Sequence, residues 1–79
     1  MSNYFNVPIK IEPVRYYSAD KIKIIRHRTG LTQNLFAQFF GVSCRTVEAW
    51  EAGRNTPSGS SSRLLALLED DILSIVNPK

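Results

Sequence analysis

Apolar and polar positions alternate with two different periods along this chain. From Phe5 to Glu12 every second residue is apolar, which is typical of a half-buried β-strand. From Ala19 onward apolar residues recur at spacings of three and four, as in amphipathic helices. The change of period predicts an N-terminal extended arm, residues 1–17, followed by a helical domain, residues 18–77.

Start and stop residues divide the helical domain into short helices. A hydroxyl residue that can cap a helix start precedes each of the first three, and a glycine that can end a helix follows each. The caps are Ser18, Thr32 and Ser43, and the glycines are Gly30, Gly41 and Gly53. These signals predict helices from about 19 to 28 or 29, at 33–40 and at 44–52, a fourth from 57 to about 69, and a fifth from 72 to 76 capped by Asp70 or Asp71. We therefore expect an all-α fold of five helices.

The helical spacing also predicts which side chains form the core. The expected core residues are Ile22, Ile25, Leu31, Phe36, Ala37, Phe40, Val47, Trp50, Leu64, Leu67 and Leu68. Apolar residues beyond this set are expected at the surface: Leu35, Phe39, Leu65, Leu73, Ile75 and Val76. Exposed apolar stripes on a small domain favour a dimer or partner surface.

The arm lacks a second strand to pair with, because the rest of the chain reads as helices. A lone strand cannot satisfy its backbone hydrogen bonds. The arm is therefore expected to pair with another chain, to lie along its own helices, or to have no fixed structure. A further alternative is a basic arm that enters the DNA minor groove through Lys10 and Arg15.

Composition excludes several classes of protein. The chain has 79 residues, enough for one small domain, and its one cysteine and one histidine allow neither an internal disulfide nor a zinc site. No pair of carboxylates, nucleophile with a base, or phosphate loop can be assembled, so we expect no enzyme activity, cofactor or metal. With no signal peptide at its start and no membrane-spanning stretch, the chain is expected to be cytoplasmic and away from membranes.

The connection between the second and third predicted helices is only three residues long, Gly41 to Ser43. So short a turn makes the third helix cross the second steeply and project one face, which is the geometry of a helix-turn-helix that reads the DNA major groove. Charge agrees with this interpretation: the net charge is +3, six Lys or Arg lie between residues 10 and 28, and an acidic cluster occupies 69–71. Such a distribution suits a protein that meets a polyanion on one side, and the alternative is an ordinary solvated surface.

When the core residues of the third predicted helix are set aside, the residues expected to face outward are Cys44, Arg45, Glu48 and Ala49. Arg45 could make a bidentate contact to guanine, and Ala49 could lie against a thymine methyl group. Glu48 could accept from a cytosine amine or hold Arg45 in place. The alternative for Arg45 is a phosphate contact that carries no sequence information.

Other residues near this helix are candidates for phosphate contacts. Free backbone amides at the start of the second helix favour an anion there. The candidates are Gln33, Asn34, Ser43, Thr46, Arg54 and Asn55, with helix capping expected as the main role of Ser43. Arg26 and Glu51 lie where the first and third helices should meet, and we expect them to form a structural ion pair.

These residues together resemble the Xre (Cro/C1-type) helix-turn-helix family. The resemblance rests on Gly30-Leu31-Thr32-Gln33, Phe36-Ala37, Gly41-Val42-Ser43, Thr46-Val47, Trp50-Glu51, Gly53 and Pro57-Ser58-Gly59, within residues 20–69. It implies a lambda-repressor-like domain, DNA-reading positions at Gln33, Cys44, Arg45 and Ala49, and an ion pair between Arg26 and Glu51.

Within that family the chain looks most like small HigA-type antitoxins, which bind a RelE- or HigB-like toxin and repress their own operon as dimers. The implied partners are thus double-stranded DNA with a palindromic operator, a second copy of the chain, and a toxin. The alternatives are a solitary repressor, or a protein-interaction module whose arm and apolar stripes bind a partner.

Overall fold

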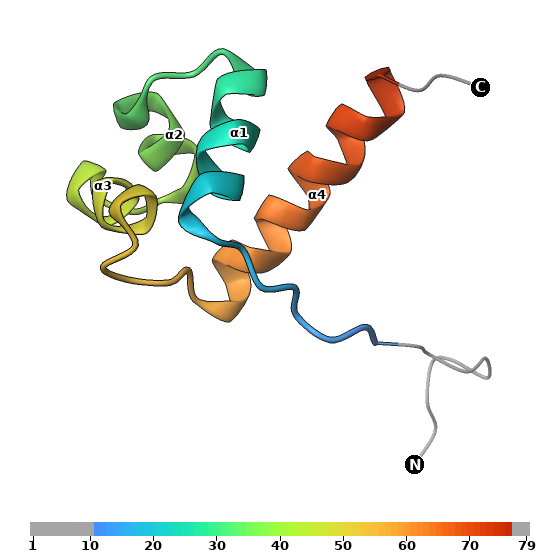
Figure 1. Ribbon diagram of the computed structural model, residues 1–79, viewed down its shortest axis with the longest axis horizontal. Helices are drawn as coiled ribbons and strands as arrows, with labels where there is room; N and C mark the ends of the chain where they lie inside the picture. The colour runs from blue at the N-terminus through green and yellow to red at the C-terminus, as the bar shows by residue number, and fades with distance from the viewer. Residues whose placement is uncertain (1–10, 77–79) are drawn as a thin grey trace.

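Four helices make up the part of the chain that the structure describes. The structure is a computed structural model, and it describes the backbone of residues 11–76 and the side chains of residues 11–72. The helices are α1 (Ala19–Thr29), α2 (Gln33–Phe40), α3 (Cys44–Ala52) and α4 (Gly59–Val76). Helix α1 lies between α3 and α4 and contacts both (Figure 1). The all-α prediction is confirmed for these residues, while most of the predicted strand falls outside them.

No helix within residues 11–76 combines the length and apolar composition that crossing a membrane requires.

The predicted bounds of the first three helices are confirmed, because their caps form as expected. The side-chain oxygens of Ser18, Thr32 and Ser43 each accept a hydrogen bond of 3.2 Å from the backbone N–H three residues ahead. The glycines that follow α1, α2 and α3 have φ between 73° and 78°, in the left-handed region. Each helix therefore ends where a residue with a Cβ would be strained.

The predicted break between a fourth and a fifth helix is wrong. Helix α4 runs without interruption from Gly59 to Val76, and the expected cap at Asp70 or Asp71 lies inside it. No glycine or proline occurs between residues 60 and 77, so nothing in the backbone chemistry stops the helix. The apolar face also continues through the acidic cluster, since Leu65, Leu68 and Ile72 all pack on the core at helical spacing.

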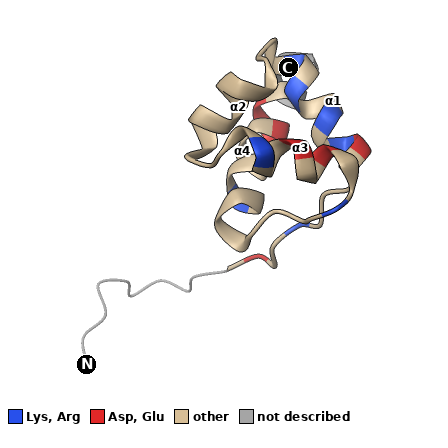
Figure 2. Cartoon of the chain, turned by 90° about the vertical axis from the view of Figure 1, so that its left-hand side faces the viewer, with Lys and Arg blue, Asp and Glu red and all other residues tan. Residues whose placement is uncertain are grey.

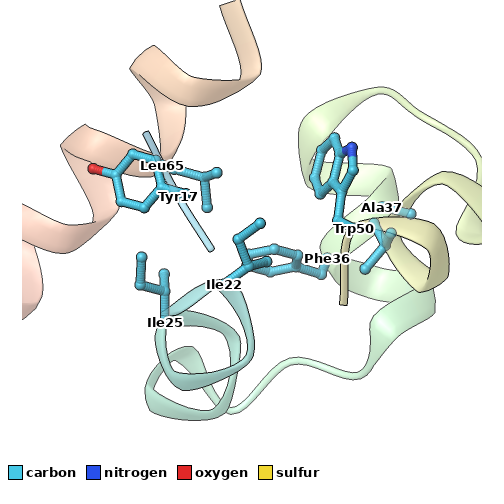
Figure 3. Close-up of a cluster of buried hydrophobic side chains, with 8 residues drawn as sticks. Tyr17, Ile22, Ile25, Phe36, Ala37, Trp50 and Leu65 are labelled. Carbon is cyan, nitrogen blue, oxygen red and sulfur yellow. The ribbon is translucent and has the colours of Figure 1, made fainter. Parts of the chain in front are cut away.

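The core lies between α1, α2, α3 and the first half of α4 (Figure 3). Its buried apolar side chains are Tyr17, Ile22, Ile25, Phe36, Ala37, Val47, Trp50 and Leu65. In α4 the prediction is reversed at two positions: Leu67 is 66% exposed, and Leu65, expected at the surface, is fully buried. The inward face of α4 begins with the buried Ser61 and Ser62, which an apolar pattern does not count.

Tyr17 attaches the segment before α1 to α4. At Arg15 and Tyr17 this fits the alternative in which the arm lies along its own helices, although these contacts were not predicted. Its ring is buried, and its hydroxyl donates to Glu69 Oε1 at 2.8 Å. Arg15 donates to Glu69 at 3.0 Å and to both carboxylate oxygens of Asp70, and Lys21 Nζ lies 2.9 Å from Glu69 Oε2. Burial alone would raise the pKa of Glu69, but the hydrogen bonds from Lys21 and Tyr17 hold that pKa below its usual range.

Leu65 of α4 is buried and Leu35 of α2 is exposed, so replacing each with alanine should change the free energy of unfolding by very different amounts. Leu65→Ala should lower the free energy of unfolding by about 2–5 kcal/mol, because it leaves a cavity in the core. Leu35→Ala, at a position on α2 that is 48% exposed, is the matched control and should cost less than about 1 kcal/mol. Urea unfolding followed by circular dichroism measures both. A loss at Leu65 as small as the loss at Leu35 would show that α4 packs on the core through another face.

Candidate nucleic-acid interface

Helix α3 is held by packing on α2 and by the turn between them. The N–H of Val42 donates to the carbonyl of Ala37 at 3.0 Å, which closes the turn. Across the turn, the rings of Phe40 and Trp50 meet edge to face, with centroids 5.5 Å apart. Val47 is fully buried on the same side of α3. The opposite side of α3 is consequently left facing outward.

A buried ion pair joins α3 to α1, at the positions where the sequence predicts one. Arg26 Nε donates to Glu51 Oε2 at 2.6 Å, and Arg26 Nη2 donates to Glu51 Oε1 at 3.0 Å. The third guanidinium nitrogen donates to the carbonyl of Leu31 at 3.1 Å, and Gln33 Nε2 donates to Glu51 Oε1 at 3.1 Å. One carboxylate therefore connects α1, α2 and α3.

The environment of Glu51 keeps its side chain charged. Burial alone would raise the pKa of this carboxyl, because the side chain is only 5% exposed. The hydrogen bonds from Arg26 and Gln33 outweigh burial and hold the pKa below its usual range. The pair is thus fully hydrogen-bonded, which is the condition under which a buried charge can be stable.

The outward face of α3 is narrower than the sequence predicts. Arg45 and Glu48 are exposed, as expected. Cys44 and Ala49 are only half-buried rather than fully outward, and Cys44 packs against the core. This corrects the expected placement of Cys44: in the first turn of α3 it lies between the core side and the outward side. Glu48 accepts a weak contact of 3.9 Å from Cys44 Sγ, and it forms no ion pair with Arg45.

The candidate phosphate contacts divide into side chains already engaged and side chains that are free to turn outward. Gln33 donates to Glu51, and the Ser43 and Thr46 hydroxyls share a hydrogen bond of 3.0 Å. Arg54, Asn34 and Asn55 are exposed, and Asn55 accepts from the N–H of the next residue at 3.0 Å. The link from Gln33 to Glu51 was not predicted, since no sequence pattern identifies which partner a half-buried amide will find.

Ion pairs distinguish two groups of basic residues. Figure 2 shows basic positions along α1 and in the segment that leads into it. Arg15 and Lys21 of this group pair with acids on α4, and Arg26 pairs with Glu51. Arg45 and Arg54, in contrast, form no ion pair within residues 11–72. Arg28 on α1 and Arg63 on α4 are also exposed and form no ion pair within these residues. Pairing therefore reduces the free positive charge of the predicted basic front without confining it to α3.

Metal ligands are not clustered anywhere in the described part of the chain: no group of three His, Cys, Asp or Glu side chains is placed to hold an ion.

The chain is similar in sequence to two curated proteins. It is 38% identical over 52 residues to the antitoxin HigA-2 of Vibrio cholerae, and this alignment covers 66% of this chain and 50% of that protein. It is 36% identical over 55 residues to the uncharacterized HTH-type transcriptional regulator YiaG of Escherichia coli, and this alignment covers 70% of this chain and 57% of that regulator. The chain thus spans about half the length of these relatives, 50% of one and 57% of the other. No family model matches the chain.

The ion pair predicts a specific pH dependence of stability. Folding lowers the pKa of Glu51, so its ionised carboxylate stabilises the folded state. This contribution is fully present at pH values above the ordinary pKa of 4.5, and it is lost as the pH falls through the lower pKa of the folded state. Glu51→Gln should therefore cost about 2–3 kcal/mol at pH 7, and the difference from wild type should shrink below pH 4.5. Thermal unfolding of wild type and Glu51→Gln from pH 3 to pH 8 measures this difference in stability.

The matched control for this experiment is Glu48→Gln on the exposed face of α3, which should leave stability nearly unchanged at every pH. A constant difference between wild type and Glu51→Gln across the acid range would show that the charge of Glu51 does not contribute.

Proposed function

We propose that this chain, whose motifs and relatives support an Xre-like helix-turn-helix domain, is a sequence-specific DNA-binding transcriptional repressor. The observation that carries the proposal is the position of Arg45. It is exposed in the first turn of a helix held by core packing and by the Glu51 network, and it has no ion-pair partner in the described residues. Neither relative is named as an enzyme, which agrees with a binding role.

Base reading is assigned to the exposed side of α3. Arg45 lies in the first turn, where a recognition helix enters the major groove, and its guanidinium can donate two hydrogen bonds to guanine. Glu48 follows on the same side and can accept from a cytosine amine. The half-buried methyl group of Ala49 is available for an apolar contact with thymine. Cys44, half-buried against the core, has the weakest support as a base contact.

Contacts to the phosphate backbone of DNA are assigned to residues at the edges of the helix-turn-helix. Asn34 lies in the first turn of α2, where free N–H groups and the helix dipole favour a phosphate. Arg54 and Asn55 follow the end of α3 and are exposed. Gln33, Ser43 and Thr46 can add contacts only through the donors that their internal hydrogen bonds leave free. These contacts set the register of the domain without reading sequence.

The finer proposal is that the chain is the antitoxin of a type II toxin–antitoxin pair, and that it represses its own operon by binding a palindromic operator as a dimer. Its support is the similarity to a protein named as an antitoxin. Similarity to a protein named only as a transcriptional regulator supports a solitary repressor instead. The arm, residues 1–17, is the proposed site of contact with a RelE- or HigB-like toxin, and residues 18–77 are the proposed DNA-binding domain.

Two arginine substitutions should separate base reading from phosphate contact. Arg45→Ala should cost about 1–3 kcal/mol on the cognate site and relax preference at one base pair. Arg54→Ala should weaken binding to all sequences about equally and lower the log–log salt slope by about one. Fluorescence anisotropy on DNA from upstream of the gene, against scrambled DNA at fixed salt, measures both effects. Equal losses on both DNAs for Arg45→Ala would make Arg45 a phosphate contact.

Co-expression tests the antitoxin role. If the neighbouring gene encodes a toxin, its expression alone should arrest growth, and co-expression of this chain should restore growth. Arg45→Ala should still restore growth, because the proposed toxin contact lies in the arm and not on α3. A neighbour that is harmless, or one whose toxicity this chain does not relieve, would support the solitary repressor. Growth rescue by a chain that shows no DNA preference would support a protein-interaction module.

A further inference from the structure

A hollow of about 480 Å³ lies between α1 and the second half of α4. Figure 1 shows these two helices diverging toward the C-terminal end of α4. Three isoleucines from the two helices form its apolar wall: Ile25 is buried, Ile72 is half-buried, and Ile24 is 55% exposed. A concave site with apolar walls between two helices, and with a volume in the range of about 300–1,000 Å³, is typical of sites for small ligands.

An ion pair bridges the two walls of the hollow. Lys21 Nζ on α1 lies 2.9 Å from Glu69 Oε2 on α4, and both residues line the hollow. The other carboxylate oxygen of Glu69 accepts hydrogen bonds from Tyr17 at 2.8 Å and from Arg15 at 3.0 Å. The charge of Glu69 is therefore compensated, and the walls are tied together before any ligand arrives. A site formed in advance costs a ligand little ordering.

Arg28 is the charged residue of the hollow whose side chain is not engaged in this way. It is exposed and forms no ion pair within residues 11–72. Asp20 also lines the hollow, but it is 90% exposed, lies 4.0 Å from Lys23 Nζ, and precedes Arg28 by about 12 Å along the helix. Arg45 and Arg54 are equally unpaired, yet neither lines this hollow. The apolar wall beside it distinguishes Arg28 from them.

We propose that this hollow binds a small amphipathic carboxylate, with the carboxylate on Arg28 and the apolar body of the ligand over Ile24 and Ile72. Ile24 and Arg28 are four residues apart on α1, so they lie on one face of the helix, one turn from each other. A guanidinium can donate two parallel hydrogen bonds to a carboxylate. The isoleucines reward an aliphatic or aromatic body, since covering them removes apolar surface from water.

A second hollow, of about 450 Å³, lies between residues 12–15 and the first half of α4. Both Glu12 and Arg63 line it, and neither forms an ion pair within residues 11–72. It therefore offers a ligand two opposite charges and selects neither an anion nor a cation. Arg63 serves instead as the matched control for Arg28, because both are exposed arginines at the edge of a hollow.

Octanoate is the probe that tests this site, because it joins a carboxylate to a flexible apolar chain. It is titrated into the full-length chain at pH 7, below its micelle-forming concentration, and followed by two-dimensional NMR of the backbone amides. Binding should be saturable with a Kd of about 1 mM or lower, and the amides of Ile24, Arg28 and Ile72 should shift most. Octylamine, with the same chain length and the opposite charge, should bind at least about tenfold more weakly.

Matched substitutions locate the bound carboxylate and the bound chain. Arg28→Gln should raise the Kd for octanoate at least about tenfold, because charge-assisted hydrogen bonds are lost, whereas Arg63→Gln should change it less than about twofold. Ile24→Ser should raise the Kd about threefold or more, and Leu35→Ser, at a similarly exposed position on α2, should leave it unchanged. All four positions are exposed, and circular dichroism of each variant confirms that the helices are retained.

Four results would overturn the assignment: amide shifts that do not saturate, octylamine binding as tightly as octanoate, equal losses for Arg28→Gln and Arg63→Gln, or largest shifts at the second hollow. The titration contains no DNA, so its failure leaves the proposed function standing. A chain that binds octanoate as expected but shows no DNA preference would contradict only the proposed function.

Discussion

The geometry of this domain depends on one buried carboxylate. Glu51 lies near the end of α3, and it accepts hydrogen bonds from Arg26 of α1 and Gln33 of α2. The same arginine donates to the carbonyl of Leu31, just before α2 begins. Apolar packing alone is non-directional and would tolerate small rotations of α3 about its axis. A hydrogen-bonded network of fixed geometry does not, so Glu51 determines which side of α3 faces outward.

A second cluster of charges determines where positive potential remains. The acids of α4 neutralise Arg15 and Lys21, which sequence alone assigns to a basic front. This neutralisation has a structural benefit, since it binds the segment before α1 to α4. Within residues 11–72 the exposed Arg45 and Arg54 beside α3 form no ion pair, and neither do Arg28 and Arg63. Net charge is therefore a poor guide to an interface in this protein, and the pairing of each charge is a better one.

Sequence predicted the elements whose signals are local. A capping hydroxyl and a left-handed glycine act within a few residues, so the bounds of α1, α2 and α3 follow from the chain itself. Helix α4 was predicted less well, because two acidic residues resemble a cap when their partners are unknown. Arg15, 55 residues away, donates to both carboxylate oxygens of Asp70, which was one of the two expected caps, inside the helix. Leu65 lies on the same buried face of α4 as Ser61 and Ser62, and apolar periodicity does not count serines.

The candidate site shows the same division between local and distant information. Exposure of Arg45 and Glu48 follows from subtracting the buried positions of α3, and the structure agrees. Cys44 was misplaced because it sits at the boundary of that face, where a helical wheel cannot decide between core and solvent. The hollow between residues 12–15 and α4 could not be found from sequence at all, since it joins residues about fifty positions apart. The ion pairs of Arg15 are contacts of the same distant kind. They hold the segment before α1 on α4, α4 packs against α1, and the pair of Arg26 with Glu51 joins α1 to α3.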